Sequence, residues 1–334
     1  MKRTFIIAEA GVNHNAELEL AYNLIDVAVA AGADAIKFQA AIPELVATAG
    51  ATKANYQKTT SPESESQLEM IRKCVFPLDV YPLLKDACIQ RGIVFFSTAF
   101  DMTSLRFLQQ LGQNLHKIPS GEITNLPFLR AIGGFGQPVI LSTGMATMAE
   151  IAEALSVLEE AGTSRAKVTV LHCNTEYPTP MQDVNLRAMQ TIGDTFGVSV
   201  GYSDHTVGIE IPIAAVALGA SMIEKHLTLD CDLPGPDHKA SLEPEPFRRM
   251  VSAIRNIEQA LGSPIKSPSP SEAANKSIVR RSLVASRPIL AGEIFTADNV
   301  VAKRPGIGIS PMHWDEVIGR TAQRAFGPDD FIEI

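Results

Sequence analysis

Short apolar runs alternate with stretches of helical spacing over the first three quarters of the chain. Runs this short, and apolar throughout, are typical of strands buried on both faces of a parallel sheet. Eight strands are predicted: Thr4–Ala8, Ala35–Phe38, Val94–Thr98, Leu115–Ile118, Val139–Ser142, Val168–His172, Val198–Tyr202 and Met222–His226. The predicted helices are Leu18–Ala31, Pro82–Arg91, Thr103–Leu111, Leu126–Phe135, Met148–Ala161, Leu186–Phe196, Val207–Leu218 and Pro244–Leu261.

Eight strand–helix units within about 260 residues predict a (β/α)8 TIM barrel. A doubly wound open sheet is the alternative. We favour the barrel because polar residues stand at nearly every strand end, as a ring of catalytic loops requires.

Three segments depart from this alternation. Ala40–Ser66 is polar and lacks clear periodicity, which is typical of a lid or binding loop. Gly262–Lys276 is rich in proline and serine, so we expect a linker with no helix in its SPSPS core. The remaining tail has short alternating runs and predicts a small β-rich domain. The predicted domains are therefore 1–261, the linker 262–276 and 277–334.

Composition limits the class of protein. The 334 residues are 46% apolar, and no apolar run approaches the roughly 18 residues of a membrane helix. A net charge of −8 without a basic stripe argues against nucleic acid. Four scattered cysteines argue against a disulfide framework and a cysteine zinc site. The first strand follows Arg3 directly and leaves no room for a signal peptide, so we expect a cytoplasmic protein.

Two histidines stand just past neighbouring strands. His205 follows the seventh predicted strand and His226 ends the eighth. The carboxyl ends of parallel strands meet at one edge, where ligands bind. Two imidazoles converging there predict a divalent metal site. The alternative is that each histidine caps its strand and bonds to backbone.

Charged and hydroxyl side chains occupy the other strand ends. Glu9 ends the first strand, where partial burial can raise the pKa of a carboxylate toward a catalytic range. Lys37 and Lys117 with nearby hydroxyls and glycines suit a phosphate and a carboxylate bound side by side. No Walker-type loop or GxGxxG occurs, so nucleotide binding is unsupported. Asp237 suits a hydroxylated substrate, and Arg304, in the tail, suits an acyl or carboxyl oxygen.

The motifs at these positions carry a resemblance. AEAGVNHN, KFQ, KIPSGE, LSTGM, NTEYPTP, GYSDHT, EKH, PGPDHKASLEP and KRPGIGIS together resemble the sialic acid synthase family, the N-acetylneuraminate synthases. The resemblance covers nearly the whole chain, and the tail resembles the antifreeze-like (SAF) domain of these enzymes. It implies condensation of phosphoenolpyruvate with an N-acetylated amino sugar, giving a nine-carbon 2-keto sugar acid and phosphate. It also implies a divalent metal, usually Mn²⁺ with Mg²⁺ or Co²⁺ as alternatives, and a domain-swapped homodimer in which the small domain covers the partner's barrel mouth.

The resemblance assigns roles residue by residue. His205 and His226 match the metal ligands, and Glu9 matches the catalytic carboxylate. The position two residues before Tyr177, an asparagine in some relatives, is Thr175 here, with Asn174 beside it. Phosphoenolpyruvate contacts are matched by Lys37, Thr98, Lys117, Ser120, Ser142 and Ser203. Sugar contacts are matched by Gln39, Glu122, Tyr177, Asp237 and Arg304, the last reaching the N-acetyl group in the other subunit.

Several functions stay open. The main prediction is an N-acetylneuraminate synthase that uses open-chain N-acetylmannosamine. The alternative is an N,N'-diacetyllegionaminate synthase that uses 2,4-diacetamido-2,4,6-trideoxymannose, with pseudaminate as a more distant product. A non-catalytic sugar-binding barrel is a further alternative, which the presence of Glu9 and both histidines disfavours.

Overall fold

The structure is a computed structural model of the chain, and it describes residues 3–60 and 65–334. It divides into two compact units, Met1–Gly262 and Ser263–Ile334.

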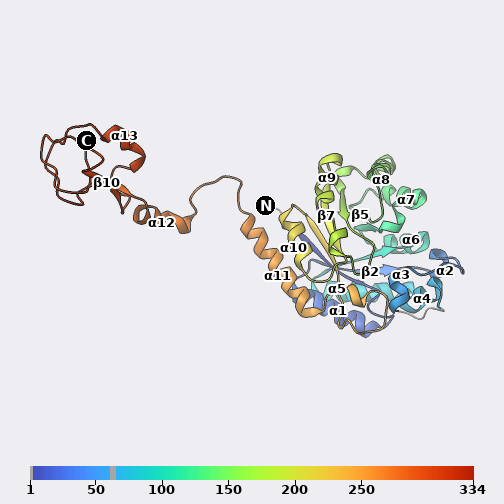
Figure 1. The fold of residues 1–334 in the computed structure, drawn as a ribbon. Coiled ribbons are helices and arrows are strands. Elements are labelled where there is room, and N and C mark those ends of the chain that lie inside the picture. The colour runs from blue at the N-terminus through green and yellow to red at the C-terminus, as the bar shows by residue number, and fades with distance from the viewer. Residues whose placement is uncertain (1–2, 61–64) are drawn as a thin grey trace. The chain divides into compact units, whose positions relative to one another are not determined.

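The first unit is a barrel of eight parallel strands. Hydrogen bonds join them in the order β3-β2-β1-β8-β7-β6-β5-β4, and β4 packs beside β3, so the sheet curls into a nearly closed barrel (Figure 1). This confirms the predicted fold. The strands are β1 Phe5–Gly11, β2 Ala35–Ala40, β3 Val94–Ala99, β4 His116–Ile118, β5 Val139–Ser142, β6 Val168–His172, β7 Ser199–Asp204 and β8 Met222–His226.

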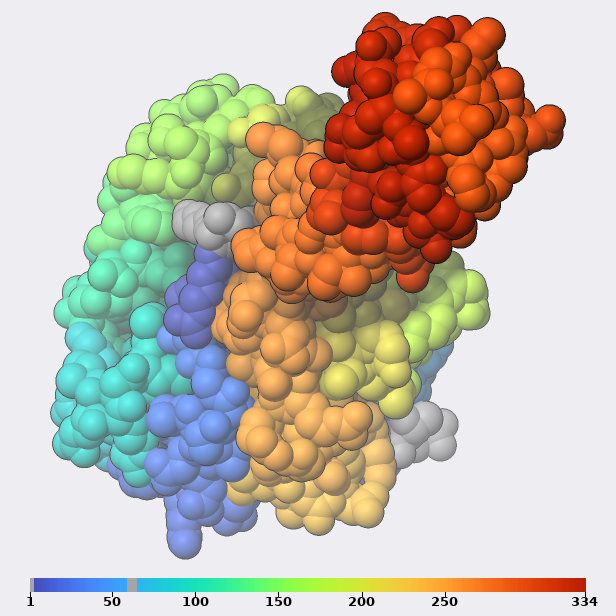
Figure 2. All heavy atoms as spheres, turned by 90° about the vertical axis from the view of Figure 1, so that its left-hand side faces the viewer, coloured from blue at the N-terminus to red at the C-terminus, as the bar shows by residue number. Residues whose placement is uncertain are grey.

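Helices surround the strands and bury the apolar outer face of the barrel. The long α11 packs against α1 and α10, and Figure 2 shows α11 (light orange) on the outer surface beside the blue N-terminal region. These helices are α1 Leu18–Ala31, α5 Tyr81–Arg91, α6 Met102–Gln110, α7 Leu126–Gly134, α8 Met148–Ala161, α9 Arg187–Phe196, α10 Glu210–Ala217 and α11 Pro244–Leu261.

A separate apolar layer fills the interior of the barrel, formed by Ile7, Ala35, Phe96, Ile140 and Leu171. Side chains along a strand return to the same face every second residue. The residues two positions after the first four of these therefore share the interior face, one layer nearer the carboxyl ends. They are Glu9, Lys37, Thr98 and Ser142.

The segment after β2 is more ordered than predicted. It contains α2 Pro43–Val46 and α3 Asn55–Thr60, and α4 Gln67–Cys74 follows it. Part of the predicted loop, residues 61–64, lies outside the described residues. The side chains of Ser66 and Glu69 form a capping box that begins α4. The expectation of a segment without secondary structure was wrong because these helices are too short to establish a periodic pattern.

The second unit also differs from its prediction at one point. Helix α12, Pro270–Val279, begins inside the predicted linker. Proline is well accommodated in the first turn of a helix, and a capping box of Ser269 and Glu272 completes the start. The expectation that the SPSPS core forms no helix therefore holds for Ser267–Ser269 and was wrong for Pro270 and Ser271, which begin α12.

The rest of the second unit is a small β-rich domain with a core of its own. Strands β9 Ser282–Ala285 and β10 Val300–Lys303 pair antiparallel, and a short helix, α13, covers Trp314–Val317. The core consists of Leu283, Ala285, Ile289, Phe295, Val300, Val317, Ala322, Phe326 and Ile332.

All four cysteines are free. Within residues 3–60 and 65–334, no helix combines the length and the apolar composition required to cross a bilayer.

Candidate active site

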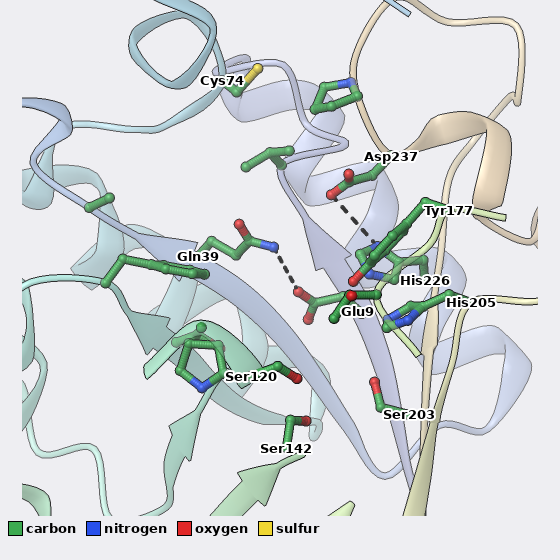
Figure 3. Close-up of a pocket in the computed structure, with 18 of the residues that line it drawn as sticks. Glu9, Gln39, Cys74, Ser120, Ser142, Tyr177, Ser203, His205, His226 and Asp237 are labelled. Atoms are coloured by element: carbon green, nitrogen blue, oxygen red, sulfur yellow. Dashed lines mark hydrogen bonds and ion pairs between the residues drawn. The ribbon is translucent and has the colours of Figure 1, made fainter. Parts of the chain in front are cut away.

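A cavity of about 370 Å³ opens at the carboxyl ends of the barrel strands. It brings together most of the site residues predicted from sequence (Figure 3). Those that line it are Glu9, Lys37, Gln39, Thr98, Lys117, Ser120, Ser142, Tyr177, Ser203, His205, His226 and Asp237.

A network of alternating charges forms one wall of the cavity. Lys37 Nζ lies 2.7 Å from Glu9 Oε2, and Lys117 Nζ donates to both carboxylate oxygens of Glu224 at 2.7 and 2.8 Å. Lys37 Nζ is also 3.7 Å from Glu224 Oε2, so Glu224 lies between the two lysines. All four side chains are buried. The buried charges are thus compensated pairwise, as burial of ions requires.

The two carboxylates in this network differ in their ionisation. Burial raises the pKa of Glu9 to about 7, with the nearby Lys37 opposing this and Glu224 adding to it. Burial also disfavours ionised Glu224, but Lys117 and Lys37 outweigh it and hold the pKa of Glu224 well below its usual range. When their environments give two neighbouring carboxyl groups very different pKa values, the one with the higher pKa can take up and release a proton near pH 7, and the other stays an anion. The raised pKa of Glu9 is compatible with the catalytic role predicted for it, which stays a prediction.

Sequence reasoning missed Glu224. The signal was present in the EKH motif, because Glu224 stands two residues before His226 on β8 and therefore faces the same side of the strand. Only the histidine of this motif was assigned a role. Glu224 also accepts a hydrogen bond from Ser203 Oγ at 2.8 Å, which joins β7 to the network.

The two histidines lie side by side, with ring centroids 5.4 Å apart. His205 Nδ1 is 2.5 Å from the carbonyl oxygen of Asn174 and donates to it, so Nε2 of the neutral ring carries a free lone pair. Burial lowers the pKa of His205 to about 4 and that of His226 well below its usual range. Both rings are therefore neutral at pH 7, which is the form that binds metals.

The surroundings of His226 also bear on metal binding. Its buried Nδ1 has no hydrogen-bond partner in the described part of the chain and lies 3.9 Å from Asp237 Oδ2. Residues 3–60 and 65–334 contain no cluster of three or more His, Cys, Asp or Glu arranged to hold an ion. Two neutral imidazoles are the ligands that this site offers. A metal held by them would have its other coordination positions open to water or substrate.

Aromatic rings hold the histidine side of the cavity in place. Tyr177 stacks on His205 with ring centroids 4.0 Å apart, and Tyr56 of α3 stacks on Tyr177 at 4.9 Å. Asp237 is buried nearby, and burial raises the pKa of its carboxyl to about 6 against the effect of Lys37.

Hydroxyl groups complete the opposite rim. Thr98 Oγ1 accepts from Lys37 Nζ at 3.0 Å, and Ser120 Oγ accepts from the backbone N–H of Gly144 at 2.9 Å. A Cβ at position 144 would lie 2.9 Å from Ser120 Oγ and 2.5 Å from Thr175 Cγ2, so only glycine fits in this turn. Thr175 lines the cavity, whereas the Asn174 side chain accepts from the backbone N–H of Glu176.

Two predicted sugar contacts lie elsewhere. Glu122 is not among the residues that line the cavity, and its Oε2 accepts from Asn125 Nδ2 at 2.5 Å. Arg304 follows β10 in the second unit and is exposed. The assignment of sugar contacts to both residues stays a prediction.

Comparison with known proteins identifies the family. Residues 24–266 match the model of the NeuB family. The chain belongs to the NeuB family. Residues 280–333 match the SAF domain, which confirms the predicted resemblance in the tail. As a NeuB-family member the chain is an enzyme, a sugar acid synthase of the transferase class, as predicted.

Two curated relatives of this NeuB-family protein share one name. It is 50% identical to the N,N'-diacetyllegionaminic acid synthase of Campylobacter jejuni over 99% of both chains. It is 44% identical to the enzyme of that name from Legionella pneumophila, covering 94% of this chain and 89% of the other. The crystal structure of N-acetylneuraminic acid synthetase from Leptospira borgpetersenii superposes with a TM-score of 0.71 at 36% identity, covering 82% of this chain and 90% of that one. These comparisons favour N,N'-diacetyllegionaminate, the alternative product in the sequence analysis, over N-acetylneuraminate, the main prediction.

The contact between Glu224 and Lys117 predicts how loss of the Glu224 charge affects substrate binding. Burial lowers the pKa of Lys117, and the Glu224 charge is the main effect that opposes this. We therefore expect Glu224→Gln to weaken the positive charge on Lys117 and to raise KM for an anionic substrate at least about 10-fold. Steady-state kinetics checks this, with Glu153→Gln on the exposed face of α8 as the control. An unchanged KM for the anionic substrate, in a variant with native thermal stability, would contradict the role of Glu224.

Proposed function

We propose that this enzyme condenses phosphoenolpyruvate with open-chain 2,4-diacetamido-2,4,6-trideoxymannose to give N,N'-diacetyllegionaminate and phosphate. The observation that carries the proposal is the 50% identity, over 99% of both chains, to a synthase named for that product. The relative named for N-acetylneuraminic acid stands at 36% identity. N-acetylmannosamine is therefore the second candidate substrate.

Phosphoenolpyruvate is assigned to the rim that carries Lys37 and Lys117. The hydroxyls of Thr98, Ser120, Ser142 and Ser203 line the same part of the cavity. Lysine ammonium groups and hydroxyls are common donors to phosphate and carboxylate oxygens.

We propose that His205 and His226 hold a divalent metal ion, with Mn²⁺ as the first candidate and Mg²⁺ or Co²⁺ as alternatives. Support comes from the neutral state of both rings, the free lone pair on His205 Nε2 and the unpartnered Nδ1 of His226. When bound, the ion would supply Lewis-acid polarisation of the sugar carbonyl oxygen.

The chain's own residues would then carry out the positioning and the proton transfer. Lys37 and Lys117 would hold the phosphate and carboxylate so that C3 of phosphoenolpyruvate faces the aldehyde carbon. As that bond forms, C2 becomes electron-poor and water adds to it. Glu9, with a pKa of about 7, would accept the proton of this water. Glu9 would then give this proton to the former aldehyde oxygen, which becomes a hydroxyl group. The tetrahedral centre would release phosphate, its hydroxyl proton would leave with the phosphate, and C2 would become the ketone of the 2-keto acid.

The groups that would orient the sugar lie on the side of Glu9 away from the serine end of the cavity (Figure 3). Gln39 Nε2 donates to Glu9 Oε1 at 3.2 Å, so its amide fixes the carboxylate as well as facing the cavity. Asp237 and Tyr177 offer acceptors and a donor to sugar hydroxyl groups. The domain-swapped homodimer, in which Arg304 reaches the partner's substrate, and the cytoplasmic location stay predictions from the resemblance and the sequence.

Parallel assays with the two sugars test the proposed substrate. Phosphate release is measured with phosphoenolpyruvate and each sugar in turn, and the products are identified by mass. We expect kcat/KM for the diacetamido sugar to exceed that for N-acetylmannosamine by about 10-fold or more. Phosphoenolpyruvate without sugar is the control and should release no phosphate. A higher kcat/KM with N-acetylmannosamine would overturn the proposed product.

A further inference from the structure

The end of the cavity away from the phosphate rim is largely apolar. Five side chains from α2, α4 and the residue after α4 line it, and we call them the α4 wall: Val46, Met70, Ile71, Cys74 and Val75. Met70 and Cys74 are buried, and the other three are half-buried. Helices α2 and α4 pack together, so the wall is one continuous surface. Polar groups are also present at this end, since Gln57 and Gln67 line the cavity too.

The order of residues along the cavity indicates which part of the sugar lies next to the α4 wall. In Figure 3, Ser142 and Ser203 lie at one end, Glu9 and His226 in the middle, and Asp237 and then Cys74 toward the other end. A sugar whose aldehyde carbon lies beside the histidines, facing phosphoenolpyruvate at the serine end, must extend its remaining carbons past Asp237. The C4 to C6 end of the sugar therefore meets the α4 wall.

The two candidate sugars differ at this end. N-acetylmannosamine has a hydroxyl at C4 and a hydroxymethyl group at C5, whereas the diacetamido sugar has an acetamido group at C4 and a methyl group as C6. A methyl group gains free energy when apolar side chains remove it from water. A hydroxyl against the same apolar side chains loses water contacts that they cannot replace with a strong hydrogen bond.

We propose that the α4 wall is the specificity determinant that selects 6-deoxy sugars, by binding the C6 methyl group. The inference rests on the proposed function for the placement of the sugar, and it adds the residues that distinguish the substrates. It can be tested whichever acetamido sugar the enzyme uses, because it concerns only whether C6 carries a hydroxyl group.

The first test uses the unmodified enzyme and a pair of sugars that differ in one group. N-acetylmannosamine and its 6-deoxy analogue are compared with phosphoenolpyruvate at saturation. We expect kcat/KM to be about 10-fold higher for the 6-deoxy analogue, with most of the difference in KM. Equal values, or a preference for the 6-hydroxyl sugar, would overturn the proposal.

The second test changes the wall while conserving its volume. Val75→Thr and Met70→Gln each replace an apolar group by a polar one of nearly the same size. We expect the preference for the 6-deoxy analogue to fall to about 3-fold or less, because the new polar atoms can pair with the hydroxyl. Val29→Thr on α1, which does not line the cavity, is the matched control and should keep the wild-type preference. An unchanged preference in Val75→Thr and Met70→Gln, at native thermal stability, would overturn the role of the wall.

The two assays distinguish an error in the proposed role of the α4 wall from an error in the proposed product. An enzyme that favours N-acetylmannosamine over the diacetamido sugar, yet prefers the 6-deoxy analogue of N-acetylmannosamine, contradicts the product and supports the wall. An enzyme that favours the diacetamido sugar but does not distinguish the two N-acetylmannosamine analogues supports the product and contradicts the wall.

Discussion

Chelation of divalent metal ions is expected to abolish condensation, with a loss of about 10³-fold or more in kcat that added Mn²⁺ restores. The expectation follows from the proposed donor pair: burial keeps His205 and His226 neutral, and their rings lie side by side. Phosphate release before and after chelator removal measures the loss and its recovery.

Direct binding of Mn²⁺ separates a role in the site from a general effect on folding. Calorimetry or electron paramagnetic resonance should detect one bound ion per chain, and His226→Gln should abolish that binding. His313→Gln, an exposed histidine paired with Glu316 in the second unit, is the control and should bind Mn²⁺ normally. Full turnover by metal-free enzyme would refute the metal role.

Glu9→Gln is expected to lower kcat by roughly 10²–10⁴-fold while binding of phosphoenolpyruvate is retained. Glutamine keeps an acceptor for Gln39 Nε2 but cannot accept a proton from water. It also removes the negative charge that lies 2.7 Å from Lys37, so the ammonium group is more available to an anionic ligand. We therefore expect the Kd for phosphoenolpyruvate to stay the same or to decrease.

Pre-steady-state phosphate release and equilibrium binding measure these two effects on the same preparation. Glu153→Gln serves again as the charge-matched control, because its side chain is exposed on α8. If Glu9→Gln turned over near the wild-type kcat, another group would have to activate the water, and Glu9 would be left as an ion-pair partner of Lys37.

The sequence predicted the rim of the barrel well for a simple reason. In a parallel barrel every strand ends at the same rim, so a polar residue at a strand end belongs to the site whatever the details of packing. The interior face repeats every second residue, which is why Lys37 and Thr98 stand two residues beyond interior core residues. Beyond β4 this repeat no longer applies, because Ser120–Glu122 is a short 3-10 helix; Ser120 lines the cavity and Glu122 does not.

Helix boundaries were predicted best where a periodic apolar face was long enough to be recognised. The prediction matched α1, α8 and α11 at both ends. Short helices depend on local capping instead, and a two-residue capping box gives a much weaker signal than a repeated apolar face. That is why α4 and α12, each begun by a capping box, did not emerge from the apolar pattern.

The sequence by itself determined the eight strands, the rim on which they end and most of the residues on that rim, because these follow from local periodicity and from parallel topology. Only the tertiary structure decided how the charges are shared. Glu224 and Lys117 are 107 residues apart in the chain, and their contact across the barrel fixes one carboxylate as an anion. Glu9 then faces burial and a second negative charge, which raises its pKa toward 7. Ionisation depends on distance through space and on exclusion of water, and neither is encoded in the spacing of residues along the chain.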